Sequence, residues 1–261
     1  MQAKQSEWHQ QWSMFEDDEI LLFKDWIYPL TLEDFRGKEV LECGCGGGQH
    51  TSFIAPFVKH IVAVDLNTVD IAEERNKKFK NVTFLEADIA EMNLRRQFDI
   101  VFSIGVVHHT ENPEKTVENL KRHVKPGGKL LLWVYSKEGN FLMEHIVEPM
   151  KKAFLKKLSN TKLLILSKLI CTFMYLPIYT IYLLPLKFLP YYRYFENFRK
   201  LSLRRNLLNV FDKLNAPLVE FISYQRISKW FADGSFTAIH ISSYNNVSWR
   251  GSGTLKSVKN K

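Results

Sequence analysis

Five short apolar runs, separated by helical patterns, constrain the fold more strongly than any other feature of the 261-residue chain. Continuous apolar runs of this length are typical of strands buried on both faces of a parallel sheet. Their alternation with helices predicts an α/β fold built on a doubly wound, mostly parallel sheet. The expected strands span residues 40–43, 61–65, 82–86, 99–103 and 129–135.

Helical patterns occupy the segments around these strands. A leading helix is expected over 14–28, where Asp17 and Asp18 would lie in the first turn and favour the helix dipole. A second helix is expected over 68–79. A third is expected over 113–125, because a capping asparagine precedes it and a proline occupies its first position.

The pattern changes after the fifth strand. Residues 141–211 contain long helical stretches without a strand signal, 226–231 resembles a short helix, and 237–242 alternates like a strand. The sheet is therefore expected to resume after a long helical insertion. The expected organisation is an N-terminal helical cap (1–35), an α/β core (36–140), a helical lid or insertion (141–225) and a return to the sheet (226–261).

A glycine-rich loop follows the first strand. Gly44, Gly46 and Gly48 stand at alternate positions, where they let the backbone bend sharply and approach a ligand closely. Asp65 ends the second strand and is suited to accept both hydroxyls of a ribose. Asp88 follows the third strand and is suited to accept from an adenine amino group, with the next residue, Ile89, covering the ring.

These motifs together resemble the class I S-adenosylmethionine-dependent methyltransferases over about residues 36–135. E-x-G-x-G-x-G, the two aspartates, G-V-V-H-H-T-x-N-P and K-P-G-G occur in the family's order. The resemblance implies a Rossmann-like fold and S-adenosylmethionine as cofactor. It places Glu42, where Asp is commoner, near the cofactor's amino acid end, and Ser103 with Gly105 at the methionine end. The implied cofactor residues are Glu42, Gly44, Cys45, Gly46, Gly48, Asp65, Leu66, Asp88, Ile89, Ser103 and Gly105.

A nicotinamide-dependent oxidoreductase is the competing interpretation of the loop. Its G-x-G-x-x-G spacing would need a third glycine at position 49, where the chain has Gln49. An acid at Glu42 suits a cationic ligand and disfavours a pyrophosphate. The sequence therefore favours a methyltransferase.

Two histidines, His108 and His109, follow the fourth strand, where the transferred methyl group should project. Either is a candidate general base for a hydroxyl acceptor, because histidine titrates near neutral pH. The alternative is that both only line the loop and bind the backbone. Aromatic side chains of the N-terminal region either shield the substrate side or pack an ordinary helix: Trp8, Trp12, Phe15 and Trp26.

Three cysteines, Cys43, Cys45 and Cys171, are too few for a disulfide framework and indicate reduced thiols. His50 alone does not complete a ligand set with the first two, so no metal site is expected. Residues 1–11 are polar and show no secretory signal, which favours a cytoplasmic protein.

The formal net charge of +8 is unevenly distributed. Residues 1–150 carry 17 basic and 24 acidic side chains, or −7, whereas residues 151–261 carry 19 and 4, or +15. The second part also contains an apolar stretch, 163–186, flanked by lysines. This stretch is interpreted as a lid over an apolar substrate pocket, with contact to an anionic membrane surface as a possible addition. A transmembrane span is disfavoured, because the strand at 237–242 should rejoin the sheet.

The sequence thus predicts a methyltransferase that acts on a small, hydrophobic or lipid-linked acceptor, with oxygen as the attacking atom. An RNA methyltransferase that uses the basic part is one alternative, although no RNA-binding module is visible and nucleic acid is disfavoured as a partner. A cofactor-binding scaffold without turnover is another. The oligomeric state stays open.

Overall fold

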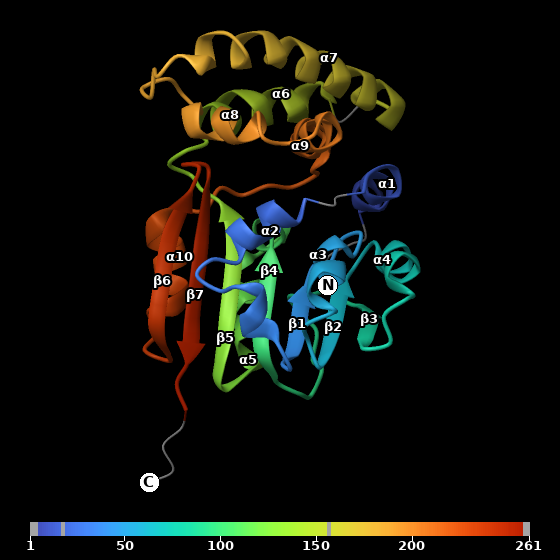
Figure 1. Cartoon of the computed structure of the whole chain (residues 1–261), viewed down its shortest axis with the longest axis vertical. Helices are drawn as coiled ribbons and strands as arrows, with labels where there is room; N and C mark the ends of the chain where they lie inside the picture. Colours follow the sequence, from blue (N-terminus) through green and yellow to red (C-terminus); the bar gives the residue numbers. More distant parts are fainter. Residues whose placement is uncertain (1–4, 17–18, 156–157, 258–261) are drawn as a thin grey trace.

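The computed structural model describes residues 5–16, 19–155 and 158–257. Within these residues seven strands form one sheet in the order β3-β2-β1-β4-β5-β7-β6 (Figure 1). Strands β1 to β5 run parallel, β7 runs antiparallel to β5, and β6 runs antiparallel to β7. The strands are β1 (Glu39–Cys43), β2 (His60–Asp65), β3 (Val82–Glu86), β4 (Phe98–Ile104), β5 (Val124–Tyr135), β6 (Phe236–Tyr244) and β7 (Ser248–Leu255).

This arrangement confirms the predicted doubly wound, mostly parallel fold. The strand order reverses between β1 and β4, and ligands of such sheets bind at the carboxyl ends beside that point. The described helices are α1 (Ser6–Met14), α2 (Ile20–Trp26), α3 (Gln49–Ile54), α4 (Val69–Asn76), α5 (Pro113–Arg122), α6 (Glu148–Ala153), α7 (Asn160–Ile178), α8 (Tyr192–Phe198), α9 (Leu203–Asn215) and α10 (Tyr224–Phe231). Short helices with other hydrogen-bond patterns are η1 (Leu32–Phe35), η2 (Val107–His109), η3 (Met143–Val147) and η5 (Ile181–Leu183).

Two apolar layers cover the two faces of the sheet, which explains why the strands are continuous apolar runs. On β1, Leu41 points into the layer formed with α5 and α10, whereas its neighbour Val40 points into the layer formed with α2 and η1. The third helix forms as expected, because the Asn112 side chain accepts a hydrogen bond from the Lys115 backbone N–H (2.9 Å).

The predicted leading helix over 14–28 is correct only over α2 (Ile20–Trp26), since α1 ends at Met14 and the chain between the two helices leaves the helical path. Phe15 interrupts the helix with an extended backbone, and its buried ring packs 5.3 Å from Phe211 of α9. The free energy gained by burying the Phe15 ring is larger than the free energy gained by continuing the helix. Asp17 and Asp18 lie outside the described residues.

The sequence pattern gives a range to β6 alone within the expected return to the sheet, although β7 occupies an interior position between β5 and β6. Its sequence lacks a strand pattern because Gly251 and Gly253 replace side chains where α10 packs on the sheet. A Cβ atom at Gly251 would come within 2.9 Å of the Ile227 side chain. Because α10 and β7 approach closely, glycines stand where apolar side chains would otherwise form the alternating pattern of a strand.

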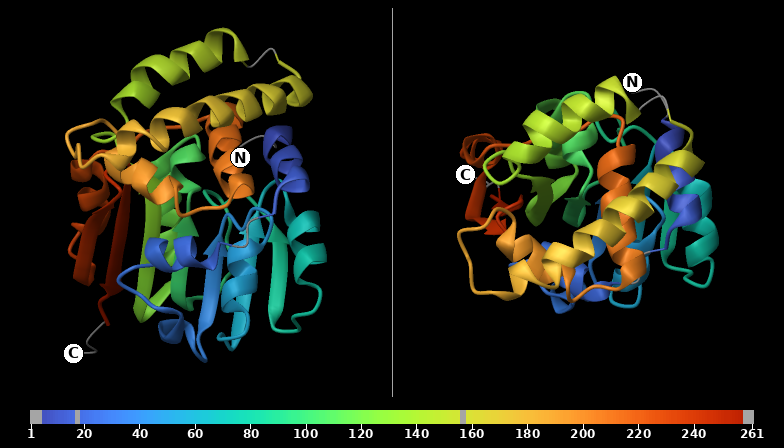
Figure 2. Two further views of the ribbon diagram at one scale, coloured as in Figure 1. Left: turned by 45° about the horizontal axis from the view of Figure 1, so that its top comes forward. Right: turned by 90° about the horizontal axis from the view of Figure 1, so that it is seen from above.

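The helices α6–α9, here called the lid, lie over the carboxyl ends of the parallel strands (Figures 1 and 2). The inner side of α7 packs on α8 and α9 through buried residues such as Leu163, Cys171 and Ile178. Among the described residues, one helix, α7, is long enough and apolar enough to cross a membrane, by length and composition alone. Only 22% of its 18-residue apolar window is buried.

Candidate active site

The glycine loop turns directly out of β1 at the point where the strand order reverses. Gly44 and Gly46 adopt positive φ angles of 84° and 53°, which favour glycine over residues with a side chain. A Cβ atom at Gly44 would lie 2.4 Å from the nearest side-chain carbon of Val106. The loop therefore needs glycine both for its conformation and for its contact with the segment after β4.

A cavity of about 440 Å³ extends from this loop, past the ends of β2 and β4, to the inner side of the lid. Its size falls within the range of small-molecule sites. Most of the predicted cofactor residues contribute to its wall: Gly44, Cys45, Gly46, Asp65, Leu66, Asp88, Ile89 and Gly105.

Asp65 is held rigidly at the end of β2. Its carboxylate accepts hydrogen bonds from the backbone N–H groups of Gly46 (3.0 Å) and Asn67 (2.8 Å). Burial raises the pKa of Asp65, and these hydrogen bonds oppose the rise because they stabilise the charged form. Asp88, at the next strand end, accepts from the backbone N–H of Ala90 (2.9 Å).

Glu42 is buried, does not line the cavity, and contacts two residues of α3. Its carboxylate accepts a hydrogen bond from the Thr51 hydroxyl (2.5 Å) and lies 3.6 Å from Nδ1 of His50, which does line the cavity. Burial raises the pKa of Glu42, while His50 and Thr51 lower it. Glu42 therefore contacts the cavity wall through His50, a residue that the sequence considered alone suggested only as a metal ligand.

Two further predicted residues, Ser103 and Gly48, also lie off the cavity wall. The Ser103 hydroxyl donates to the carbonyl oxygen of Cys43 (2.7 Å), so it ties β4 to β1 beneath the loop. Gly48 caps α3, and its carbonyl oxygen accepts from the Asn76 amide (2.9 Å). Both residues support the loop and strand that form the cavity wall. A sequence motif does not distinguish residues that line a cavity from residues that hold its wall in place.

The two histidines of η2 point to different surroundings. His108 is completely buried, does not line the cavity, and lies 4.4 Å from the ring of Tyr135. Burial lowers its pKa well below the usual value. His109 lines the cavity, and its pKa is lowered by burial but raised by Asp212 and by a hydrogen bond to Leu218. Of the two candidate bases, His109 is therefore the one that lines the cavity, and His108 lies off its wall.

The hydrogen bond of His109 fixes its tautomer. Nδ1 lies 2.5 Å from the carbonyl oxygen of Leu218, and a carbonyl oxygen only accepts. Nδ1 therefore carries the proton, and Nε2 is the basic nitrogen of the neutral ring. The neighbouring Glu220 backbone N–H donates to the carbonyl oxygen of His108 (2.8 Å), so the chain that leaves the lid is fixed to η2 at two points.

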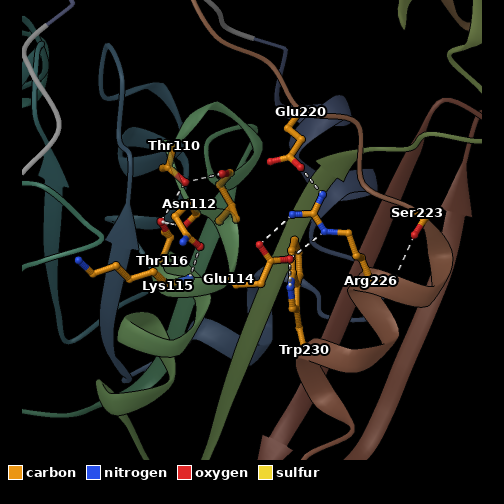
Figure 3. Close-up of polar contacts among 10 residues, drawn as sticks. Thr110, Asn112, Glu114, Lys115, Thr116, Glu220, Ser223, Arg226 and Trp230 are labelled. Atoms are coloured by element: carbon orange, nitrogen blue, oxygen red, sulfur yellow. Dashed lines mark hydrogen bonds and ion pairs between the residues drawn. The ribbon is translucent and has the colours of Figure 1, made fainter.

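An ion cluster anchors this returning segment to α5 (Figure 3). Arg226 of α10 pairs with both carboxylate oxygens of Glu114 (2.8 Å each) and with Glu220 (2.5 Å). The Arg226 guanidinium lowers the pKa of Glu114, and the two acids raise the pKa of Arg226. The cluster joins the lid's exit to the first turn of α5 and thereby positions Leu218 against His109.

A polar group at the junction of core and lid was missed by the sequence analysis. Asp212 of α9 accepts from the Gln11 amide (2.8 Å) and from the Tyr135 hydroxyl (3.1 Å), and all three residues line the cavity. Burial raises the pKa of Tyr135 well above its usual value, and the charge of Asp212 adds to this. The available signal was that Asp212 is one of only four acids in the basic part.

Helix α1 covers the glycine loop. Trp8, Trp12 and Trp26 line the cavity, whereas Phe15 packs under the lid instead. The Trp8 ring lies 5.0 Å from that of His109. Three of the four candidate aromatics therefore lie where they exclude water from the site. Within the described ranges, no group of three His, Cys, Asp or Glu side chains is arranged to hold a metal ion.

Comparison with known proteins agrees with this geometry. Residues 41–132 match the family model of the methyltransferase domain. Together with the sheet topology and the cavity at the strand ends, this match shows that the chain carries a class I S-adenosylmethionine-dependent methyltransferase domain. Its cofactor is S-adenosylmethionine, and the earlier resemblance is confirmed.

Relatives with different acceptors resemble the same segment. The chain is 27% identical over 114 residues to a tRNA U34 carboxymethyltransferase of Pseudoalteromonas atlantica, covering 42% of this chain and 35% of the relative. It is 29% identical over 105 residues to a ubiquinone biosynthesis O-methyltransferase of Rickettsia conorii, covering 38% and 35%. The chain thus spans about a third of the length of these relatives.

A solved structure extends the likeness in fold. The N-methyltransferase NodS of Bradyrhizobium japonicum WM9 matches with a TM-score of 0.52 at 13% identity, over 92% of this chain and 99% of that one. At this identity the likeness shows the fold alone.

The cavity has the chemistry that S-adenosylmethionine requires. Several wall residues, with His50 and Gln49 nearest the glycine loop, have buried polar atoms without a protein partner in the structure, as expected where a polar ligand completes the site. Asp65 and Asp88 supply acceptors at the positions expected for ribose and adenine. These residues would hold the cofactor, while Gly44 and Gly46 allow close approach.

Proposed function

We propose that the protein transfers the methyl group of S-adenosylmethionine to an oxygen atom of a small, hydrophobic, lipid-like acceptor. The observation that carries this proposal is the continuity of one cavity from the glycine loop to the apolar inner side of the lid, with His109 at the junction. A polar acceptor would gain no free energy of binding from burial against the apolar wall of the lid.

The acceptor end of the cavity is lined by lid residues. Ile170 and Met174 of α7 contribute aliphatic surface, and the lining aromatics of the 191–198 segment are Tyr191, Tyr194, Phe195 and Phe198. Aromatic and aliphatic walls of this kind bind rings and hydrocarbon chains by burial of apolar surface. Polar side chains also reach this end, among them Glu148, Arg205, Asn209 and Lys213, and we assign the orientation of a hydroxyl to Tyr135 and Asp212, which lie beside His109.

His109 is the proposed general base. When bound, the cofactor supplies an electrophilic methyl group on its sulfonium. Nε2 of His109 would take the acceptor's hydroxyl proton as the oxygen–methyl bond forms, which leaves an imidazolium. The nearby carboxylate of Asp212 favours this charged ring, since it raises the pKa of His109. Trp8 covers the ring and limits access of water.

One relative supports oxygen as the attacking atom, and the relatives together do not decide the acceptor. One matched protein is named as an O-methyltransferase of ubiquinone biosynthesis, whereas another is named for its action on tRNA. The enclosed apolar end of the cavity favours the first kind of acceptor. RNA and protein remain as separate outcomes of the experiment below.

The deciding experiment supplies the protein with S-adenosylmethionine labelled in its methyl group and a whole-cell extract. Label is expected in the fraction soluble in organic solvent. Label in RNA, with binding that falls steeply as salt increases, would contradict the proposal in favour of the RNA enzyme. Cofactor binding without label in any fraction would indicate a scaffold.

A matched pair of variants tests the base. His109→Asn keeps a side-chain N–H donor directed at Leu218 but lacks the basic nitrogen, so turnover should fall by roughly two to four orders of magnitude. The dissociation constant for the cofactor should change little. His108→Gln, off the cavity wall, should retain most of the turnover. Similar turnover in both variants would refute the role of His109.

A further inference from the structure

The outer side of α7 is apolar and exposed. Ile165, Leu169, Phe173 and Leu176 follow one another at helical spacing and form a single stripe. All four are at least half exposed, and Phe173 and Leu176 reach 74% and 71%. The opposite side of the same helix is the buried side that packs on α8 and α9.

The stripe continues past the end of α7 into the segment 179–188. The resulting patch is here called the outer lid surface, and α7, which carries the stripe, lies on the far side of the lid from the sheet (Figures 1 and 2). The outer lid surface consists of Ile165, Leu169, Phe173, Leu176, Tyr179, Ile181, Leu183, Leu184 and Phe188.

A surface of this kind is unusual on a helix in contact with water. A surface helix normally turns one apolar stripe to the core and polar residues outward. On α7 both sides are apolar, and contiguous exposed apolar patches mark sites of contact with a protein or a membrane. The outer lid surface therefore needs a partner.

The charges around this surface indicate which partner fits. Residues 151–200 carry ten basic side chains and one acidic side chain, Glu196. Exposed lysines flank the apolar stripe: Lys162 and Lys168 lie on α7, and Lys187 precedes the exposed Phe188. An apolar surface edged by lysine complements a bilayer interface that carries anionic headgroups.

We propose that the outer lid surface binds in the interface of a membrane with anionic lipids, with α7 lying parallel to the membrane plane. A transmembrane orientation does not fit, because the inner stripe of α7 is occupied by α8 and α9. Pro177 also interrupts the hydrogen bonds of the last turn.

The same helix then separates the bilayer from the acceptor end of the cavity. Ile170 and Met174 line the cavity, while Leu169 and Phe173, one position before each, lie on the outer lid surface. This second part of the inference rests on the proposed function: a lipid-like acceptor would reach the cavity from the membrane. The binding itself requires neither cofactor nor acceptor.

Vesicle sedimentation with the full chain tests the binding. The protein should sediment with vesicles of phosphatidylcholine and phosphatidylglycerol, and much less with phosphatidylcholine alone. The double variant Phe173→Glu/Leu176→Glu should lose at least tenfold in vesicle affinity. Leu21→Glu is the matched control, because Leu21 of α2 is 67% exposed but lies outside the outer lid surface. It should bind like the wild type.

The lysines give an independent readout. Lys162→Glu/Lys168→Glu should weaken binding to anionic vesicles by at least roughly fivefold per lysine, since each contributes about 1 kcal/mol near such a surface. Its binding to neutral vesicles should not change. Equal affinity for anionic and neutral vesicles, or wild-type affinity in all variants, would overturn the inference.

Two further outcomes separate this inference from others. If light scattering shows a dimer that Phe173→Glu/Leu176→Glu dissociates, and no variant binds vesicles, the surface is an interface between copies and the inference is overturned. If the protein binds vesicles but labels only RNA, the proposed function fails while the membrane surface stands.

Discussion

Substitution of Gly44 by alanine separates the two reasons for glycine in the loop. Gly37 is the matched control, because its φ of 70° is also positive but no atom lies within 4 Å of the position of a Cβ. A left-handed conformation costs alanine about 1–2 kcal/mol, and the reduced freedom of the unfolded chain returns about 0.4–1 kcal/mol. Gly37→Ala should therefore destabilise by about 1 kcal/mol.

Gly44→Ala carries the same cost and an overlap as well. The new Cβ would lie 2.4 Å from Val106, and overpacking of this kind costs about 1–3 kcal/mol. The variant should therefore be about 2 kcal/mol less stable than Gly37→Ala, or about 6 °C lower in Tm for a chain of this size. Affinity for S-adenosylmethionine should also fall, because relief of the overlap moves the loop.

A double-mutant cycle measures the overlap directly. Val106→Ala removes the two nearest atoms, the Cγ carbons at 2.4 and 2.5 Å, and leaves its Cβ at 2.8 Å, so the penalty of Gly44→Ala should shrink in part in that background. Thermal unfolding and calorimetric titration with the cofactor supply the two readouts. Equal destabilisation by Gly44→Ala and Gly37→Ala, or an unchanged penalty beside Val106→Ala, would refute the reasoning.

Three further predictions concern the histidines and the ion cluster. Because burial lowers the pKa of His109, kcat should fall in acid with a midpoint below the usual 6.5, and a midpoint above 6.5 in the pH–rate profile would contradict its role. For His108, whose folded pKa is also depressed, the unfolded chain takes up the proton first as pH falls. Stability should therefore be complete above pH 6.5 and decline below it by up to about 1.4 kcal/mol per pH unit. Urea unfolding on both sides of pH 6.5 should show a smaller decline in His108→Gln, and an equal decline would exclude this source. Arg226→Lys, which cannot pair with both oxygens of Glu114, should lower kcat several-fold with an unchanged cofactor dissociation constant, and parallel changes in both would argue against a positioning role.

Local sequence determined the α/β core. The apolar runs, the cap of α5 and the glycine loop predict parallel strands and a ligand at their carboxyl ends, since each depends on residues close together in the chain. Asp65 and Asp88 could be placed for the same reason, because each directly follows its strand.

Other features depend on contacts between distant segments, and only the tertiary structure decided them. The path of Phe15 depends on a pocket under α9, and the position of β7 depends on the packing of α10 against glycine. Adjacent sequence does not distinguish His108 from His109, because the hydrogen bond that orients His109 comes from Leu218, 109 residues further on. The composition predicted a basic, apolar second part. Folding decided that one side of α7 faces the cavity and the other faces outward, because burial follows the packing of helices against each other and not the hydrophobicity of the residues alone.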